Sequence, residues 1–582
     1  MKRRFLSLLL VALMLLSTIA ITACNKTTGN DTTAGKDTTA AADTTAAASG
    51  DLTTVTILCR SMNNNQNPHY RYSENPRWEQ IPEVAAFYEK LAAVGVELQF
   101  EVIDNEQYDS AVKTRLMTGV DLPDIISNPS MTDVEAVNLG ASGIAANVID
   151  LINEYDEDGS IKAYWDEVDG AWFSTVMTEE GALYWMPYTF RSVKVDETGA
   201  ELDYVPFDCT YSVSLREDWL NNIGVEWKQF WTLDELYDVI VAMYENDANG
   251  NGIKDEVLGN FSTEFWTGFE PAFDMGQELI NVRNNGKGVQ CNLYAEGFTD
   301  YIEFLQKLYN AGVIDTTTLS GTNVMTANRA SVYNGYTGQT WEEASITGYE
   351  DTAVYSPIII DDDEGENGWA IPLCDNLYMV LEKWFINAES ENLEAVVKLF
   401  DIMYTDETSV ACTYGKEGVH FEIDEATGLR VSTDLKYDKE NPDPTALTLR
   451  VLTSGPLPNI YDKTSIVALE EKSNPLYQHK ADAEYWRFMN AERATVQEGI
   501  APYAMATTEE LETITALETT LKTYIDEMML KLIIGEYSLD DYPTYLAELE
   551  SMGLKDYIAV FEARHQRFMD YAAEIGQSTI YD

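Results

Sequence analysis

The 582-residue sequence is poor in positive charge and in histidine. It has 38 Lys and Arg residues against 98 Asp and Glu residues, which gives a formal net charge of −60 at pH 7. A field of that sign repels nucleic acid and anionic lipid headgroups, so we expect no nucleic-acid partner. The four histidines are far apart and lack the spacing of metal ligands: His69, His420, His479 and His565.

Familiar catalytic motifs are also missing. The sequence has no G-x-S-x-G elbow, no H-E-x-x-H pair and no P-loop. A glycoside hydrolase needs two carboxylates placed across a sugar, but with 98 acidic residues such pairs arise by chance. The sequence therefore favours a binding protein over an enzyme, and it indicates no organic cofactor.

Long hydrophobic runs are confined to the N-terminus. The first 24 residues, "MKRRFLSLLLVALMLLSTIAITAC", join a basic start to an apolar stretch, which is typical of a secretory signal peptide. The ending "ITAC" resembles the lipobox of bacterial lipoproteins. That resemblance implies that residues 1–23 are removed and that Cys24 carries acyl chains such as palmitate. The alternative is an ordinary signal peptide with a chance cysteine.

The segment 24–51 is rich in Thr, Ala, Gly and Asp and contains "DTTA" three times. It has too little apolar bulk to pack, so we expect a disordered tether. We therefore expect the protein to be lipid-anchored on the outer face of the cytoplasmic membrane. The five cysteines beyond the tether are scattered and odd in number, which indicates no disulfide framework and leaves their pairing open: Cys59, Cys209, Cys291, Cys374 and Cys412.

The remaining residues exceed one compact core, so two lobes are expected. Residues 54–60 and 96–103 have strand patterns, and the amphipathic stretch 79–95 between them predicts a helix that ends at Gly95. A further short strand is predicted within 124–130. This rhythm predicts an α/β sheet with helices on both faces.

Helix starts are clearest later in the chain. Thr232 with Glu235, and Thr507 with Glu510, each form the sequence pattern of a capping box. The second helix is predicted to stop at Gly535, and two further helical segments follow. The C-terminal sixty residues are thus expected to form a helical layer.

Four stretches carry a family resemblance: "LMTGVDLPDII" at 116–126, "SLREDWLNNIGVEW" at 214–227, "YGKEGVHFEIDEATG" at 414–428, and the C-terminal helices from "YIDEMMLKLIIGEYSLDDYPTY" onward. In this order they resemble the family 1 extracellular solute-binding proteins of ABC importers, in the lipoprotein branch that serves oligosaccharide uptake. The resemblance spans about residues 55–570. It departs from the family pattern at Pro543 and at Trp185.

The resemblance implies a two-lobed, periplasmic-binding-protein-like α/β fold with inter-lobe crossovers. Lobe one is expected at 52–207 with 380–440, and lobe two at 208–379 with 441–582. The family analogy places the ligand in a cleft between the lobes and makes an importer permease the partner. A surface glycan-docking or adhesin lipoprotein without an importer remains an alternative, and a glycan-degrading enzyme is the least favoured one.

Aromatic rings are the natural contacts for a sugar, because they stack on its C–H face. The sequence offers candidates in loops or beside Gly and Asn, and for each the alternative is ordinary packing. The sequence does not identify the ligand, which is an oligosaccharide or another small solute such as a peptide. The candidate ligand-binding residues are Trp185, Trp266, Trp341, Trp369, Tyr188 and Asn63.

The stretch "DANGNGIKDE", 247–256, resembles the start of an EF-hand loop. Asp247, Asn249 and Asn251 fall at loop positions 1, 3 and 5, Gly252 at the turn, the Ile253 carbonyl at 7 and Asp255 at 9. Position 12, which should be a bidentate Glu, is Leu258, so the site is expected to be weak unless a distant acid or Glu256 completes it. We expect a structural calcium ion, and the alternative is a hydrated turn.

Overall fold

The computed structural model describes the folded part of the chain in segments. These are residues 52–61, 82–168, 170–195, 211–259, 265, 267–276, 278–283, 288–316, 324–325, 327–336, 355–361, 372–373, 377–425, 428–432, 456–458, 460–466, 495–496 and 503–576. They contain two large hydrophobic cores, and we call the elements around them the first and the second lobe. Within these segments, none of the helices combines the length and hydrophobicity that crossing a bilayer requires.

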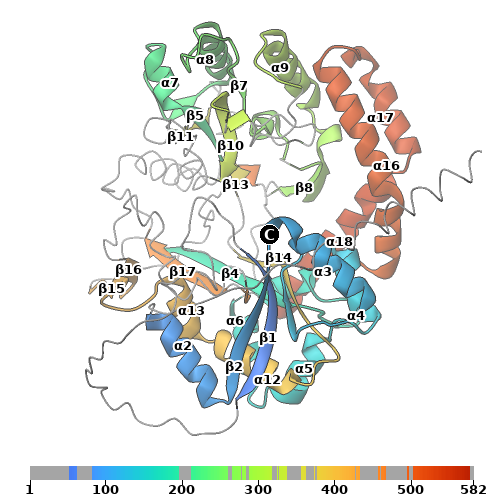
Figure 1. The fold of residues 1–582 in the computed structure, drawn as a ribbon. Coiled ribbons are helices and arrows are strands. Elements are labelled where there is room, and N and C mark those ends of the chain that lie inside the picture. Colours follow the sequence, from blue (N-terminus) through green and yellow to red (C-terminus); the bar gives the residue numbers. More distant parts are fainter. Residues whose placement is uncertain are drawn as a thin grey trace, which may run out of the picture. The chain divides into compact units, whose positions relative to one another are not determined.

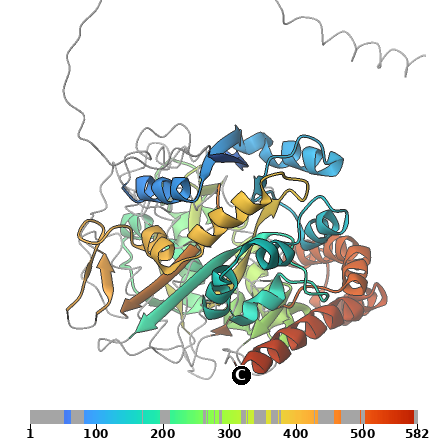
Figure 2. The same cartoon turned by 90° about the horizontal axis from the view of Figure 1, so that it is seen from below.

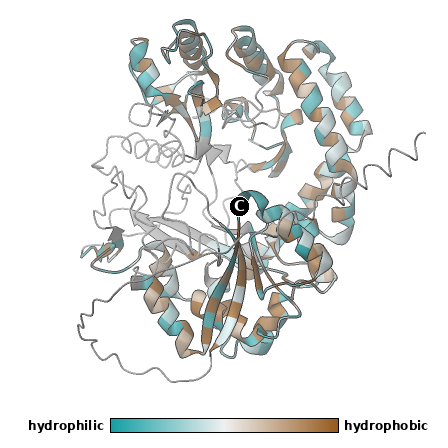
Figure 3. Ribbon diagram, viewed as in Figure 1, coloured by the Kyte–Doolittle hydropathy of each residue, from teal (hydrophilic) through white to brown (hydrophobic). Residues whose placement is uncertain are grey.

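A six-stranded sheet in the order β17-β4-β14-β3-β1-β2 organises the first lobe (Figure 1). β1 is parallel to both β2 and β3, whereas β14 is antiparallel to β3 and to β4. The central strands are among its most hydrophobic parts (Figure 3). The strands are β1 (Thr53–Arg60), β2 (Val96–Ile103), β3 (Ile125–Ser127), β4 (Met186–Val195), β14 (Leu377–Ile386) and β17 (Ile460–Ile466).

The helices of the first lobe pack their buried faces on this sheet. The predicted strands at 54–60 and 96–103 and the helix between them are confirmed, and Gly95 follows that helix with φ 81°. The helices are α2 (Pro82–Ala93), α3 (Asn105–Thr118), α4 (Asp133–Ala141), α5 (Val148–Tyr155), α6 (Ser160–Val168), α12 (Leu393–Met403) and α13 (Asp406–Thr413), and the hairpin strands β15 (Phe421–Ile423) and β16 (Arg430–Ser432) follow α13.

A four-stranded sheet in the order β11-β5-β10-β7 organises the second lobe. Its helix α8 starts with the predicted capping box, since both hydrogen bonds between Thr232 and Glu235 are formed. The elements are β5 (Tyr211–Arg216), α7 (Glu217–Asn222), α8 (Leu233–Glu245), β7 (Val257–Leu258), α9 (Phe298–Asn310), β10 (Ala330–Tyr336) and β11 (Tyr355–Pro357), with short pairs formed by β6 (Phe230–Trp231) and β12 (Ile359–Ile360) and by β8 (Ile280–Arg283) and β9 (Gly288–Cys291).

The C-terminal helical layer is present as predicted and consists of α16 (Thr508–Ile533), α17 (Tyr542–Ser551) and α18 (Leu554–Ile575) (Figure 2). α18 takes part in both cores. Leu554 and Tyr557 in its first turns lie in the second core, whereas Phe568 and Ala572 near its end lie in the first. One continuous helix therefore links the two lobes mechanically.

The expected lobe boundaries remain a prediction. Several described parts of 441–582 depart from them. β17 pairs in parallel with β4 over Ile460–Ile466, so it joins the sheet of the first lobe, and the first core also includes Met505 and, near the end of α18, Phe568 and Ala572. The expectation had grouped 441–582 with the second lobe. A strand of seven residues carries too little sequence pattern to show which sheet edge it will join.

Candidate functional site

Polar side chains gather where β1 and β3 end. Arg60 is the last residue of β1, and its Nη2 donates to Asp109 Oδ1 at 3.1 Å and to the carbonyl oxygen of Asn128 at 2.8 Å. Its guanidinium lies 4.8 Å from the centre of the Tyr108 ring. The carboxyl ends of parallel strands are the usual ligand-binding edge of an open α/β sheet, so these residues occupy the position expected of a binding site.

Asp109 is fixed in its charged form. Burial alone would raise the pKa of this carboxyl, but hydrogen bonds from Ser130 and the charge of Arg60 outweigh it and lower the pKa. Ser130 donates through its backbone N–H at 2.8 Å and through its hydroxyl at 3.0 Å. The result is an ionised acceptor and a guanidinium donor held side by side.

β14 supplies the other side of this polar group. The Asn128 N–H donates to the Lys383 carbonyl at 2.8 Å, which fixes β14 beside the end of β3. Lys383 Nζ lies 3.2 Å from Asp133 Oδ1 and 5.2 Å from the centre of the Trp185 ring. The neighbouring Glu382 is desolvated, and this burial raises its pKa. Carboxylates, an amide and cations beside an aromatic ring suit the hydroxyls of a sugar.

The structure places two of the six predicted ligand-binding residues. Trp185 is 1% exposed in the first core, edge-on to Phe385 at 6.3 Å, and Tyr188 is half-buried against the same core. This burial favours packing for Trp185, so its ligand contact stays a prediction. The other four residues lie outside the described residues: Asn63, Trp266, Trp341 and Trp369.

The residues at the strand ends were missed by the sequence analysis. Arg60 and Asp109 are 49 positions apart, and Arg60 and Asn128 are 68 apart. The signal that could have identified Arg60 was its place at the end of the first predicted strand. Nothing local in the sequence marks Asp109 or Asn128 as its partners.

The loop 247–256 connects α8 to β7 and has the turns of a cation-binding loop. Asp247 accepts two backbone hydrogen bonds, from Asn251 at 3.0 Å and from Gly252 at 2.8 Å. The side-chain oxygens of Asn249 and Asn251 also accept loop N–H groups, at 3.0 and 2.7 Å. The side-chain amide nitrogens of these two asparagines each donate to Asp255 Oδ1 at 3.0 Å. The three side chains thus converge on one point.

Glu256 brings a second carboxylate to this loop. It is fully buried, and its two oxygens accept the N–H groups of Asn249 at 3.0 Å and of Asp255 at 3.2 Å. Its neighbour Val257 starts β7, which pairs with β10, so sheet formation holds Glu256 in place. It lies two residues before Leu258, the position at which an EF-hand would have its acid.

The loop is also fastened to the segment that precedes β10. Asn249 Nδ2 donates to the Asn328 carbonyl at 3.2 Å, and Arg329 Nε donates to the Asp255 carbonyl at 3.1 Å. The side chain of Asn328 accepts from the fully buried Arg216 at 2.7 Å. Any ion in the loop would therefore act on the sheet of the second lobe.

The described residues contain another acidic group, formed by Asp156, Asp158 and Asp401, whose oxygens lie within 4.8 Å of one another. Asp156 accepts from Ile161 N–H at 3.2 Å, Asp158 accepts from Ser160 N–H at 3.0 Å, and Asp401 accepts from the Ser160 hydroxyl. These bonds satisfy donors in the first turn of α6, which gives the cluster a structural role.

Residues 78–409 match the family model described as bacterial extracellular solute-binding protein. The chain belongs to this family. It is 25% identical over 498 residues to the fructooligosaccharide ABC transporter substrate-binding protein FusA of Streptococcus pneumoniae, covering 80% of this chain and 84% of FusA. It is also 25% identical to lipoprotein LipO of Bacillus subtilis, over 46% of this chain and 53% of LipO.

Solved structures of this family share the two-lobed fold. FusA in complex with kestose superposes with a TM-score of 0.59 at 20% identity, covering 90% of this chain and all of FusA, and its EF-hand mutant with fructo-nystose gives the same values. The alginate-binding protein AlgQ2 without calcium ion gives a TM-score of 0.57 at 17% identity, covering 89% of this chain and 99% of AlgQ2.

Proposed function

We propose that this solute-binding protein captures an oligosaccharide and delivers it to an ABC importer. The observation that carries the proposal is the similarity to FusA over most of both chains, together with family membership. The polar group of Arg60, Asp109 and Asn128 at the strand ends supports it, because it brings a guanidinium, a carboxylate and a backbone carbonyl together for sugar hydroxyls. Trp266, Trp341 and Trp369 remain our proposed stacking residues.

The protein binds its sugar without changing it, in this proposal. The relative FusA is a substrate-binding protein and the family is one of solute-binding proteins. This similarity supports binding without turnover. A glycan-docking lipoprotein without an importer would use the same residues. Deletion of the protein distinguishes the two functions. Cells lose uptake of the sugar if the protein serves an importer, and they keep it if the protein only docks glycans.

The loop 247–256 holds a structural calcium ion in this account. Asp247, Asn249, Asn251, the Ile253 carbonyl, Asp255 and Glu256 would supply the oxygen ligands, a donor set that suits a hard cation. The ion would supply positive charge to carboxylates that converge in the loop. Hydrogen bonds made by Asn249 and Arg329 hold the loop against the segment before β10.

Cys24 anchors the protein to the membrane through acyl chains, and residues 25–51 act as its tether, in the same proposal. A two-chain anchor is sufficient for stable attachment. The lipobox-like "ITAC" and the similarity to LipO support this assignment.

The function is tested by titrating the purified protein with neutral and acidic oligosaccharides and with peptides, using the melting temperature as the readout. A ligand that binds only the folded state raises it. We expect a rise with a neutral oligosaccharide and its chemical recovery unchanged. Conversion of the sugar at a rate that follows protein purity would replace the proposal with an enzyme.

A further inference from the structure

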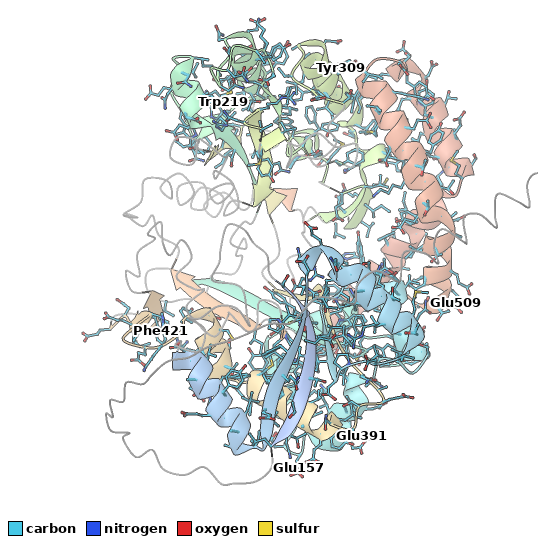
Figure 4. The ribbon with its side chains drawn as sticks, viewed as in Figure 1. Glu157, Trp219, Tyr309, Glu391, Phe421 and Glu509 are labelled. Carbon is cyan, nitrogen blue, oxygen red and sulfur yellow. The ribbon has the colours of Figure 1, made fainter. Side chains whose placement is uncertain are left out.

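A groove of about 590 Å³ lies in the first lobe between α2, α13 and the β15–β16 hairpin. This volume falls in the range of about 300–1,000 Å³ that is typical of small-molecule sites. Figure 4 labels Phe421 at the hairpin, next to α13. The apolar part of the lining comes from all three elements: Ala86, Phe87, Val410, Ala411, Phe421 and Ile423.

One buried carboxylate in this lining, that of Glu83, has no hydrogen-bond partner among the described residues. Glu83 is 8% exposed, and neither of its carboxylate oxygens accepts a hydrogen bond from any residue that the structure describes. His420 Nδ1 lies 3.5 Å from Glu83 Oε1, but it already accepts the Lys416 N–H at 2.9 Å. That nitrogen therefore has no proton to give to Glu83. Burying a charged group without partners is costly, so Glu83 is an acceptor that a ligand can satisfy.

The charges around the groove select the kind of ligand. Lys90, Lys416 and Arg430 also line it, as do the acidic residues Asp406, Glu407 and Glu417, and Lys90 is paired with Glu407 at 2.5 Å. Arg430 lies 6.0 Å from the centre of the Phe421 ring. A cationic ligand would meet these three cations, and an anionic one would meet four carboxylates, Glu83 among them. A neutral ligand with many hydroxyls avoids both repulsions.

A sugar ring matches this arrangement in detail. Two neighbouring hydroxyls can donate to the two oxygens of one carboxylate, here Glu83. The C–H face of the ring can pack on Phe87 or Phe421, as sugars do on aromatic side chains. The cations at the rim donate to the remaining sugar oxygens.

We propose that this groove is a second carbohydrate-binding site, which takes a neutral sugar residue with Glu83 as the acceptor of a hydroxyl pair. The ligand class rests on the proposed function, but the site consists of residues other than those at the ends of β1 and β3. It allows the first lobe to hold sugar independently of Arg60.

Hydrogen–deuterium exchange of the purified protein with saturating kestose tests this site. We expect slower exchange in residues 82–93 and 406–432 of the wild-type protein, and the same protection in Arg60→Ala. Glu83→Ala should lose the protection and weaken binding at the groove about tenfold or more, because a charged acceptor is removed. Glu89→Ala is the matched control, since Glu89 is exposed on the same helix and does not line the groove.

Glu83→Gln keeps the shape and one acceptor, so it serves if Glu83→Ala fails to fold, and it should weaken the protection rather than abolish it. Protection at the ends of β1 and β3 without protection of the groove overturns this inference alone. If neither kestose nor fructo-nystose slows hydrogen exchange anywhere in the protein, the proposed function is overturned as well. A trilysine peptide that protects the groove when kestose does not would assign it to a cationic ligand and refute the proposal.

Discussion

Replacing Asp247 by Asn tests the calcium loop without disturbing its backbone. Asp247 has φ 51°, a left-handed conformation that Asn adopts readily and Ala does not. Its two oxygens accept the N–H groups of Asn251 and Gly252, and an Asn side chain keeps one of these acceptors. Asp247→Asn therefore removes the charge at the first loop position and leaves the turn in place.

The expected effect is small and can be bounded. If the dissociation constant is about 10⁻⁴–10⁻³ M, as in extracellular calcium modules, about 1 mM calcium stabilises the folded state by about 0.4–1.4 kcal/mol. For a cooperative unit of about 200 residues this corresponds to a rise in melting temperature of about 1–5 °C. Asp247→Asn should abolish the rise. Asp247→Ala should also abolish it and destabilise the calcium-free protein by about 1–2 kcal/mol, since the left-handed turn is strained.

Melting temperatures in chelator, in calcium and in magnesium are the assay. Asp274→Asn is a matched control, because Asp274 also has a left-handed conformation, φ 55°, but lies outside the loop. A full calcium response in Asp247→Asn would refute the assignment of the ligands. Sugar affinity should change less than about threefold in chelator, since the loop is fastened to the second lobe through residues 328–329 and not to the residues at the ends of β1 and β3. Loss of sugar binding in chelator, with the fold intact, would place the ion in the binding mechanism.

Three further predictions concern the anchor and the C-terminal helices. Cys24→Ser should move the folded protein from the membrane fraction to the medium or soluble envelope fraction, and continued sedimentation with membranes would contradict the anchor. Phe568→Ala should destabilise the protein by about 3–5 kcal/mol in denaturant unfolding, because it empties a site in the first core; a loss below about 1 kcal/mol would contradict the link made by α18. Burial alone would raise the pKa of Glu510, but its hydrogen bonds from Arg567 and Thr507 lower it. Its contribution to stability should therefore be present above about pH 4.3 and be lost as the pH falls further, and Glu510→Gln should show a flatter stability curve in that acid range.

Local signals explain which parts of the fold were predictable. The strand at 96–103 alternates, and the capping boxes at Thr232 and Thr507 are complete within four residues. Both capping boxes are formed in the structure. Such elements depend on neighbours in the sequence, so the sequence alone shows them.

The strand-end site, formed by Arg60, Asp109 and Asn128, depends instead on tertiary contacts. Arg60 finds Asp109 and Asn128 only because β1 lies between β2 and β3 in the sheet. Trp185 shows the converse problem. A tryptophan that packs in a core and one that stacks on a sugar have the same hydrophobicity, and only its position just before β4 places this ring in the first core.

Glu256 lies between these cases. The sequence offers it as a substitute for the missing acid at Leu258, but its burial follows from the pairing of β7 with β10. Residue types and spacing therefore suggest a ligand set, which stays a prediction. The fastening of the loop to Asn328 and Arg329 could not be predicted from the sequence, because these residues lie 79 and 74 positions from their partners.

Calorimetric titration of the purified protein with kestose tests the central claim most directly, with Arg60→Ala as the variant and the sugar analysed afterwards. We predict saturable binding, at least about tenfold weaker at the strand-end site in Arg60→Ala, because a donor to the sugar is lost while the melting temperature confirms the fold. The sugar should be recovered unchanged. Absence of binding by every neutral oligosaccharide tested, or conversion of kestose in proportion to the protein added, would contradict the account.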